Sequence, residues 1–263
     1  MMQTLYKNRI WLIGGSEGIG LELVKQLLTE QACLVVSARK AEQNTELKIL
    51  KEKHKDSLYL LNLDVTKKTD LKMKTNQAWS VFNGLDSWIY NAGVYHPMRI
   101  KEWDIEKFEQ MNQVNYLGVV YLMHQLIPYF KASSSLSKPQ PQWLWNISLA
   151  SDFGLPYGGG YSAPKAALQN LAESLQPELL QLGIELKVVN HGFVKTRLTA
   201  KNDFSMMGLM TPEVAAQKIV MTLKRAKFET RFPFSLASLL GFIKRLPKTW
   251  ALTITKRMLT DVK

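Results

Sequence analysis

The stretch RIWLIGGSEGIGLELVKQLLTEQ, residues 9–31, decides the fold. An apolar run from Arg9 to Ile13 leads directly into a glycine-rich turn, and apolar residues then recur with helical spacing from Leu21 onward. Glycines in such a turn let the backbone approach a pyrophosphate, and the N-terminus of the following helix offers it free N–H groups. The stretch therefore predicts a strand–turn–helix unit suited to a phosphate-bearing ligand, although a glycine loop alone could be only a tight turn.

Strand and helix signals alternate along the rest of the chain. Short apolar runs are expected to form strands at residues 33–38, 58–65, 85–93, 142–148 and 184–190. Segments with helical spacing are expected to form helices at residues 46–55, 70–82, 104–130, 161–182 and 211–226, and the polar residues 133–140 a loop. Strands that are apolar on both faces and separated by helices indicate a parallel sheet covered on both sides. The predicted fold is α/β: a doubly wound parallel sheet (Rossmann fold) in three α/β/α layers, forming a single domain.

The composition is that of an ordinary globular protein, with 263 residues of which 46% are hydrophobic and 21% charged. The single cysteine, Cys33, excludes a disulfide framework within the chain and a cysteine-based zinc site, and it suits a reducing compartment. His54, His96 and His124 lack metal-ligand spacing, so we expect no metal. The first apolar run leads into glycines rather than a cleavage site, and no stretch reaches the roughly 20 apolar residues of a membrane-spanning helix. We expect a cytoplasmic protein.

The formal net charge is +12, and much of the excess lies near the C-terminus. Ten basic residues from Lys224 onward face only two acidic ones, Glu229 and Asp261. Such a charge attracts polyanions, anionic lipid surfaces or phosphorylated ligands. No nucleic-acid-binding motif accompanies it, and we expect no nucleic-acid partner.

Two further motifs follow in chain order, NAG at residues 91–93 and YSAPK at residues 161–165. Tyr161 and Lys165 lie four residues apart on a predicted helix, so they share one face and the ammonium can approach the phenol. That spacing alone also fits two amphipathic side chains on a surface helix. Together with the glycine loop, however, the two motifs resemble the short-chain dehydrogenase/reductase family over about residues 8–225.

The resemblance implies an active site built from Asn115, Ser148, Tyr161 and Lys165. Tyr161 would be the general acid/base, with its pKa lowered by Lys165 and by the positive nicotinamide ring of the oxidised cofactor. Ser148 would donate a hydrogen bond to the substrate oxygen, with Ser151 as a nearby alternative. Asn115 would anchor a proton-relay water through the helix backbone, unless it is only a polar helix residue.

Cofactor choice depends on the end of the second predicted strand. Arg39 stands there beside Lys40 where an aspartate would favour NAD, and this favours the 2′-phosphate of NADP(H) over a merely solvated strand end. Glu17 is a counter-argument, because many phosphate-preferring relatives have a basic residue at that position. Asp64 resembles the family's adenine-contacting aspartate and could equally cap a strand. The expected cofactor-binding residues are Gly14, Ser16, Glu17, Gly18, Ile19, Gly20, Ser37, Arg39, Asp64, Val65, Asn91, Ala92, Gly93, Tyr161, Lys165, Gly192, Val194 and Thr196.

Three positions depart from the family's pattern. Ile13 stands where a threonine usually precedes the first glycine. Pro164 replaces the usual serine before the lysine, and we expect it in a first helical turn, where proline is tolerated. His191 stands where the family usually has a proline, and we expect it to pack or to form a hydrogen bond rather than to take part in catalysis.

We expect residues 1–226 to form a Rossmann-type NADP-binding catalytic domain and residues 227–263 a basic, apolar extension on or beside it. The expected function is an oxidoreductase that transfers a hydride between NADP(H) and a carbonyl/alcohol substrate, which could be apolar or lipid-like. A non-catalytic NADP(H)-binding regulatory protein is the alternative. The family implies a homodimer or homotetramer, and the extension suits either packing or peripheral contact with a membrane.

Overall fold

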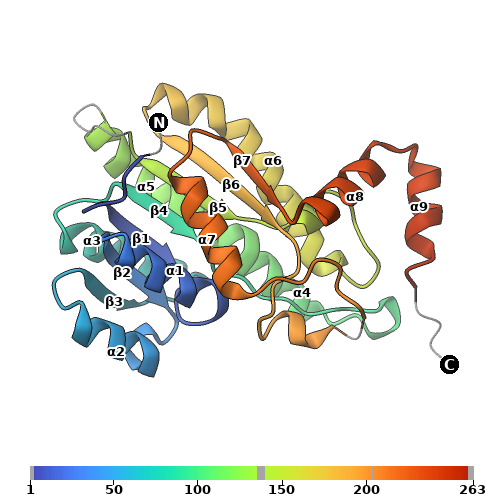
Figure 1. Ribbon diagram of the computed structural model, residues 1–263, viewed down its shortest axis with the longest axis horizontal. Coiled ribbons are helices and arrows are strands. Elements are labelled where there is room, and N and C mark those ends of the chain that lie inside the picture. The colour runs from blue at the N-terminus through green and yellow to red at the C-terminus, as the bar shows by residue number, and fades with distance from the viewer. Residues whose placement is uncertain (1–2, 135–139, 203, 260–263) are drawn as a thin grey trace.

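The computed structural model describes residues 3–134, 140–202 and 204–259. In this part of the chain, seven parallel strands form one sheet in the order β3-β2-β1-β4-β5-β6-β7 (Figure 1). The strands are β1 (Arg9–Ile13), β2 (Cys33–Ala38), β3 (Leu58–Asn62), β4 (Ser87–Tyr90), β5 (Gln142–Asn146), β6 (Glu185–His191) and β7 (Glu229–Phe232). The doubly wound parallel sheet predicted from the sequence is confirmed.

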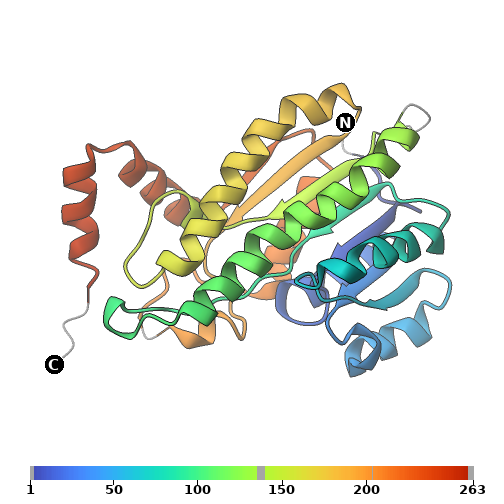
Figure 2. The same cartoon turned by 180° about the vertical axis from the view of Figure 1, so that it is seen from behind.

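Helices cover both faces of the sheet. They are α1 (Gly18–Thr29), α2 (Thr45–Lys53), α3 (Lys68–Val81), α4 (Ile105–Asn112), α5 (Gly118–Ser134), α6 (Gly159–Gln181), α7 (Pro212–Leu223), α8 (Phe234–Arg245) and α9 (Lys248–Lys256). Figure 1 shows α1 and α7 in front of the sheet, and Figure 2 shows α3, α5 and α6 in front of its other face. The sheet is thus the middle of three layers.

The two faces of the sheet bury separate apolar cores because successive strand residues point in opposite directions. On β1, Ile10 and Leu12 pack with α1 and α7, whereas Trp11 and Ile13 pack with α3, α5 and α6. The same strand is therefore apolar on both faces, which explains its unbroken apolar run.

Two predicted helices differ in detail from those observed. The helix expected at residues 104–130 consists of α4, a π-helical turn (Gln113–Leu117) and α5, so it extends to Ser134. The predicted loop at residues 133–140 therefore begins inside α5, and its residues 135–139 lie outside the described residues. Helix α6 begins at Gly159 rather than Tyr161. Pro164 therefore lies in the second helical turn, and the expectation of a first-turn proline is wrong.

The segment after residue 226, which we expected as an extension, begins with the edge strand β7. Val188–His191 of β6 pair with Glu229–Phe232 of β7, so the sheet continues across the expected boundary. Helices α8 and α9 follow at the end of the molecule farthest from α2 (Figure 1). None of the helices in the described part of the chain is long and apolar enough to cross a membrane.

The glycine loop between β1 and α1 depends on close backbone contacts. Gly14 has a φ of 86°, and a Cβ there would lie 2.6 Å from the backbone nitrogen of Ala92. A Cβ on Gly20 would lie 1.9 Å from the carbonyl oxygen of Gly14. Any side chain at either position would push the loop away from the neighbouring backbone.

We expect Gly20→Ala to destabilise the protein by about 2 kcal/mol or more, because an added methyl group must displace backbone rather than a flexible side chain. Gly154→Ala is the matched control, since a Cβ at Gly154 would meet no atom within 4 Å. Urea unfolding of the two variants and the wild type checks this. Equal unfolding midpoints for both variants would contradict the close contact at Gly20.

Candidate active site

A cleft of about 1300 Å³ lies at the carboxyl ends of the strands, where the loops after β1, β2, β4, β5 and β6 meet. The strand order reverses there between β1 and β4, which is where open α/β sheets bind ligands. The volume exceeds the roughly 300–1,000 Å³ of a typical small-molecule site, so two molecules can fit side by side. All but three of the site residues expected from the sequence line this cleft; the exceptions are Gly20, Ser37 and Asn115.

Ser37 and Asn115 support the cleft from behind. The fully buried Ser37 hydroxyl accepts a hydrogen bond from Trp11 Nε1 at 2.9 Å, so it points into the core. This differs from the expectation that Ser37 contacts a cofactor. The Asn115 side chain accepts from the backbone N–H of Val94 and donates to its carbonyl, both at 2.9 Å. Because Asn115 sits in the π-helical turn, this pair of bonds joins the turn to the loop after β4.

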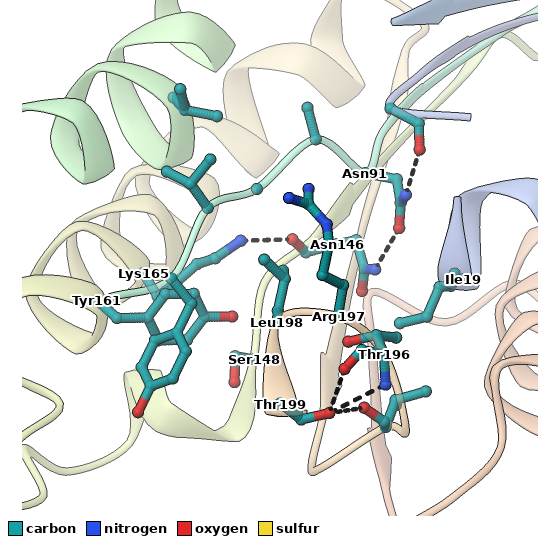
Figure 3. A pocket seen from close by; sticks show the side chains of 18 of the residues that line it. Ile19, Asn91, Asn146, Ser148, Tyr161, Lys165, Thr196, Arg197, Leu198 and Thr199 are labelled. Atoms are coloured by element: carbon teal, nitrogen blue, oxygen red, sulfur yellow. Dashed lines mark hydrogen bonds between the residues drawn. The ribbon is translucent and has the colours of Figure 1, made fainter. Parts of the chain in front are cut away.

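Tyr161 and Lys165 project from one face of α6 into the cleft. Figure 3 shows them on one side, Thr196 and Thr199 on the other, and Ser148 between them. Lys165 Nζ donates to the carbonyl oxygen of Asn146 at 3.0 Å and lies 5.7 Å from the centroid of the Tyr161 ring. The YSAPK pair is therefore part of a cleft and not of a solvated helix surface.

Burial changes the pKa of both groups. It raises the pKa of Tyr161 to about 12, opposite to the lowering that we expected from Lys165, although a hydrogen bond with Ser148 opposes the rise. It lowers the pKa of Lys165 to about 7, since the buried ammonium loses its hydration. Near neutral pH the phenol is protonated, so it can give a proton to a basic oxygen in the cleft.

Ser148 is held by a buried polar network that the sequence did not predict. Its backbone N–H donates to Asn190 Oδ1 at 3.2 Å, and its Oγ donates to the carbonyl oxygen of His191 at 3.3 Å. Asn190 is fully buried and donates to Gln169 Oε1 at 2.9 Å and to Glu229 Oε1 at 2.7 Å. The sequence signal for Asn190 is weak, because β6 also contains the polar residues Glu185, Lys187 and His191.

The structure distinguishes Ser148 from the alternative, Ser151. Ser148 lines the cleft, whereas Ser151 does not. The Ser151 hydroxyl donates to the carbonyl oxygen of Ser148 at 2.8 Å and lies 3.4 Å from Asn190 Oδ1. Ser151 therefore supports the loop that presents Ser148.

A second chain of hydrogen bonds links Lys165 to the glycine loop. Asn146, whose carbonyl accepts from Lys165, donates through Nδ2 to Asn91 Oδ1 at 2.8 Å. Asn91 Nδ2 in turn donates to the carbonyl oxygen of Gly14 at 2.8 Å. Asn146 Oδ1 is buried and has no hydrogen-bond partner among the described residues, although Asn146 lines the cleft. A ligand with a hydroxyl or N–H group can supply that missing donor.

The part of the cleft next to the loop after β2 is rich in exposed cations. Arg39 and Lys40 line it after β2, and the side chain of neither forms a hydrogen bond or ion pair with another described residue. Glu17 of the glycine loop is instead paired with Arg197, with oxygen–nitrogen distances of 2.6 and 3.1 Å. The negative charge of Glu17 is therefore neutralised across the cleft.

His191 and Asp64 both form local hydrogen bonds. His191 Nδ1 lies 2.7 Å from the carbonyl oxygen of Gly192, the ring stacks on Phe232, and burial lowers the pKa of His191 to about 4. Asp64 Oδ1 accepts from the backbone N–H and the hydroxyl of Thr66 at 3.0 and 2.7 Å. His191 is thus neutral near pH 7, and Asp64 caps a turn while it lines the cleft.

Comparisons with known proteins agree with this architecture. A family model described as short chain dehydrogenase matches residues 8–205. An uncharacterized oxidoreductase of Staphylococcus haemolyticus is 25% identical over 221 residues, which are 84% of this chain and 93% of that protein. The fold is similar to that of a short chain dehydrogenase from Burkholderia cenocepacia in complex with NADP, with a TM-score of 0.80, 18% identity and coverage of 98% and 100% of the two chains. It is also similar to 3-ketoacyl-(acyl-carrier-protein) reductase from Brucella melitensis complexed with NADH, with a TM-score of 0.76, 20% identity and coverage of 86% and 98%.

We expect Lys165→Met to be more stable than the wild type at pH 6, on the order of 2 kcal/mol, because the wild type must bury an ammonium there. The advantage should shrink as the pH rises from about 7 toward 10.5, where the folded wild type loses its proton and the unfolded chain still binds one. Urea unfolding across this pH range checks the expectation.

The exposed helix residue Lys72 supplies the control, Lys72→Met, whose stability relative to the wild type should not follow this pH dependence. A Lys165→Met advantage that stays constant from pH 6 to pH 10 would contradict a depressed pKa of Lys165.

Proposed function

The chain belongs to the short-chain dehydrogenase family, and on this basis we propose that it is an oxidoreductase that transfers a hydride between NADP(H) and a carbonyl/alcohol substrate. One observation carries the proposal. The half-buried Tyr161 and the buried Lys165 stand beside Ser148 in a cleft that the glycine loop also lines. A proton donor, a hydrogen-bond donor and a phosphate-binding loop therefore face one cavity.

Each residue has a defined task in this proposal. Tyr161, protonated near neutral pH, gives its proton to the oxygen of a carbonyl substrate during reduction and takes it back during oxidation. Ser148 donates a hydrogen bond to the same oxygen. Lys165 lies close enough for its charge, when protonated, to stabilise the phenolate. The network behind Ser148 holds these groups in place before the substrate binds.

The residues present fit a dinucleotide, which would supply the hydride. The N–H groups of Gly18, Ile19 and Gly20, at the start of α1, have no acceptor among the described residues, and no side chain caps this helix. Such a helix start binds a pyrophosphate. The unpaired Asn146 Oδ1, on the chain of hydrogen bonds between Lys165 and the glycine loop, offers a further acceptor to such a ligand.

We favour NADP(H) over NAD(H) because of the charges at the adenosine end. Arg39 and Lys40 are exposed and unpaired there, and a guanidinium binds a 2′-phosphate through charge-assisted hydrogen bonds. The ion pair with Arg197 removes the objection that Glu17 would repel that phosphate. The Burkholderia relative was crystallised with NADP and the Brucella relative with NADH, so fold similarity favours neither cofactor.

The part of the cleft next to α8 is apolar and suits an apolar carbonyl compound. Its walls come from the segments after β5 and β6 and from α8; they include Leu149, Leu155, Phe193, Phe204, Leu236 and Leu240. These side chains offer no charge to bind, so they favour a hydrocarbon chain or ring next to the reacting carbonyl.

We expect purified protein to oxidise NADPH in the presence of a ketone, an aldehyde or a 3-oxoacyl thioester, and Tyr161→Phe to lose at least about 100-fold in kcat/KM. The phenylalanine keeps the ring and removes only the hydroxyl, so NADPH binding should persist. Absorbance at the NADPH band and fluorescence titration measure the two quantities.

Wild-type turnover that survives in Tyr161→Phe would contradict the assigned role of Tyr161. Tight NADPH binding without any turnover across the substrate panel would favour the alternative, a non-catalytic regulatory protein.

We expect Arg39→Gln to raise KM for NADPH by roughly tenfold and to leave KM for NADH unchanged, since only NADPH carries the 2′-phosphate. Arg225→Gln is the matched control, because Arg225 is exposed and lies outside the cleft. Steady-state kinetics with each cofactor distinguish the outcomes. An equal effect on both cofactors, or faster wild-type turnover with NADH, would contradict the preference for NADP(H).

A further inference from the structure

Helices α8 and α9 follow one another at one end of the molecule, and we refer to them together as the C-terminal helix pair. Both views of the fold place the pair beyond the edge of the sheet, with α9 turned away from α8 and from the body of the protein (Figure 1, Figure 2). Its buried side is packed, since Leu236, Leu240, Ile243 and Ala251 lie in a small apolar cluster with Leu149. The pair is thus held to the protein through this cluster.

The solvent-exposed side of this helix pair, which we call the outer face, carries large apolar side chains. Phe234 is 85% exposed, Trp250 64% and Phe242 59%. Leu252 and Ile254 are also exposed, and on α9 only Ala251 and Thr255 are buried. Single exposed apolar residues are ordinary, but a group of this size on two adjacent short helices indicates a surface that binds something.

The charge around these side chains has one sign. Residues 232–259 contain five basic residues and no aspartate or glutamate; the basic residues are Lys244, Arg245, Lys248, Lys256 and Arg257. Of these five side chains, only Lys244 has a carboxylate of a described residue within 4 Å, that of Asp152 at 3.9 Å, and Lys248 Nζ lies 5.3 Å from the centroid of the Phe153 ring. The exposed apolar side chains therefore stand among basic residues, of which Arg245, Lys256 and Arg257 have no acidic or aromatic partner among the described residues.

We propose that the outer face of α8 and α9 docks the protein on the surface of an anionic lipid bilayer. Aromatic and aliphatic side chains enter the boundary between headgroups and acyl chains, and the lysines and arginines attract the anionic headgroups. The helices lie on the membrane and do not cross it. This inference goes beyond the proposed function and does not depend on it.

Charge complementarity selects a bilayer over a second copy of the chain. A two-fold symmetric dimer through this face would set the same patch against itself, so Arg245, Lys256 and Arg257 would meet their own copies, and residues 232–259 supply no carboxylate to pair with them. An anionic bilayer offers negative charge and an apolar interior at once. It therefore matches both features of the face.

The position of α8 gives docking a consequence for the cleft. Leu236 and Leu240 on its inner side line the cleft, whereas Phe234 and Phe242 on its outer side are exposed. One helix, about 10–12 Å wide with its side chains, separates the two sides. A docked protein therefore holds the apolar end of its cleft next to the acyl chains.

Flotation of the full chain with vesicles tests the proposal. We expect the protein to float with vesicles of phosphatidylglycerol and phosphatidylcholine and to bind pure phosphatidylcholine vesicles at least tenfold more weakly. Raising the salt concentration should weaken the binding, because each basic residue near the surface contributes about fivefold.

Two sets of variants separate the outer face from the rest of the surface. Phe242→Ser with Trp250→Ser should lower binding to the anionic vesicles at least tenfold. Ile49→Ser with Met73→Ser is the matched control, because both residues are exposed on α2 and α3, away from α8 and α9, and it should bind like the wild type. Circular dichroism verifies that each variant is folded.

The proposal is overturned if folded wild type stays below the vesicle fraction, or if the control variant loses as much binding as the variant in α8 and α9. Size-exclusion chromatography adds a further outcome: a wild-type dimer that the variant in α8 and α9 converts to a monomer, without vesicle binding, would identify the face as an interface between copies. NADPH turnover with a water-soluble carbonyl should be equal in all three proteins when vesicles are absent. That readout tests the proposed function separately, so failure of either idea can be told from failure of the other.

Discussion

The buried hydrogen bond from the Lys165 ammonium to the carbonyl oxygen of Asn146 is the contact on which the cleft depends. A cation with so little access to water needs a fixed acceptor, and this one comes from the last residue of β5. The hydrogen bonds continue from Asn146 to Asn91 and from Asn91 to Gly14, so one series of polar contacts joins α6 to the ends of three neighbouring strands. Hydrogen bonds therefore link Lys165, beside Tyr161, to the glycine loop.

The polar network around Asn190 has a similar effect on the opposite wall. A buried amide with unmade hydrogen bonds is costly, so a fully bonded Asn190 favours one arrangement of the Ser148 loop over all others. The edge strand β7 contributes to this through Glu229, which also pairs with Arg231 at 3.0 Å. The C-terminal part of the chain thus takes part in the site and is not only an addition to the fold.

Charge and polarity are segregated along the cleft. Cations gather at the end formed by the β2 loop, orphan N–H groups lie at the start of α1, and apolar side chains gather beside α8. This order matches a ligand that is anionic at one end and a second ligand that is apolar where it reacts. The same helix that forms the apolar wall carries the exposed aromatic residues Phe234 and Phe242, so the proposed substrate and the proposed membrane surface share one chemistry.

The sequence by itself determined the alternation of strands and helices, the glycine turn and the placement of Tyr161 and Lys165 on one helical face, because all three are patterns between residues close in the chain. It predicted Ser37 at the cofactor and Pro164 in a first turn, and both differ in the structure because the Trp11 indole and the start at Gly159 were not visible in those patterns. Only the tertiary structure decided that Ser148 and not Ser151 lines the cleft, that Asn190 supports it, and that Glu17 meets Arg197. Most of these contacts join residues tens to well over a hundred positions apart, and such pairs become neighbours only once the sheet order brings the strand ends together.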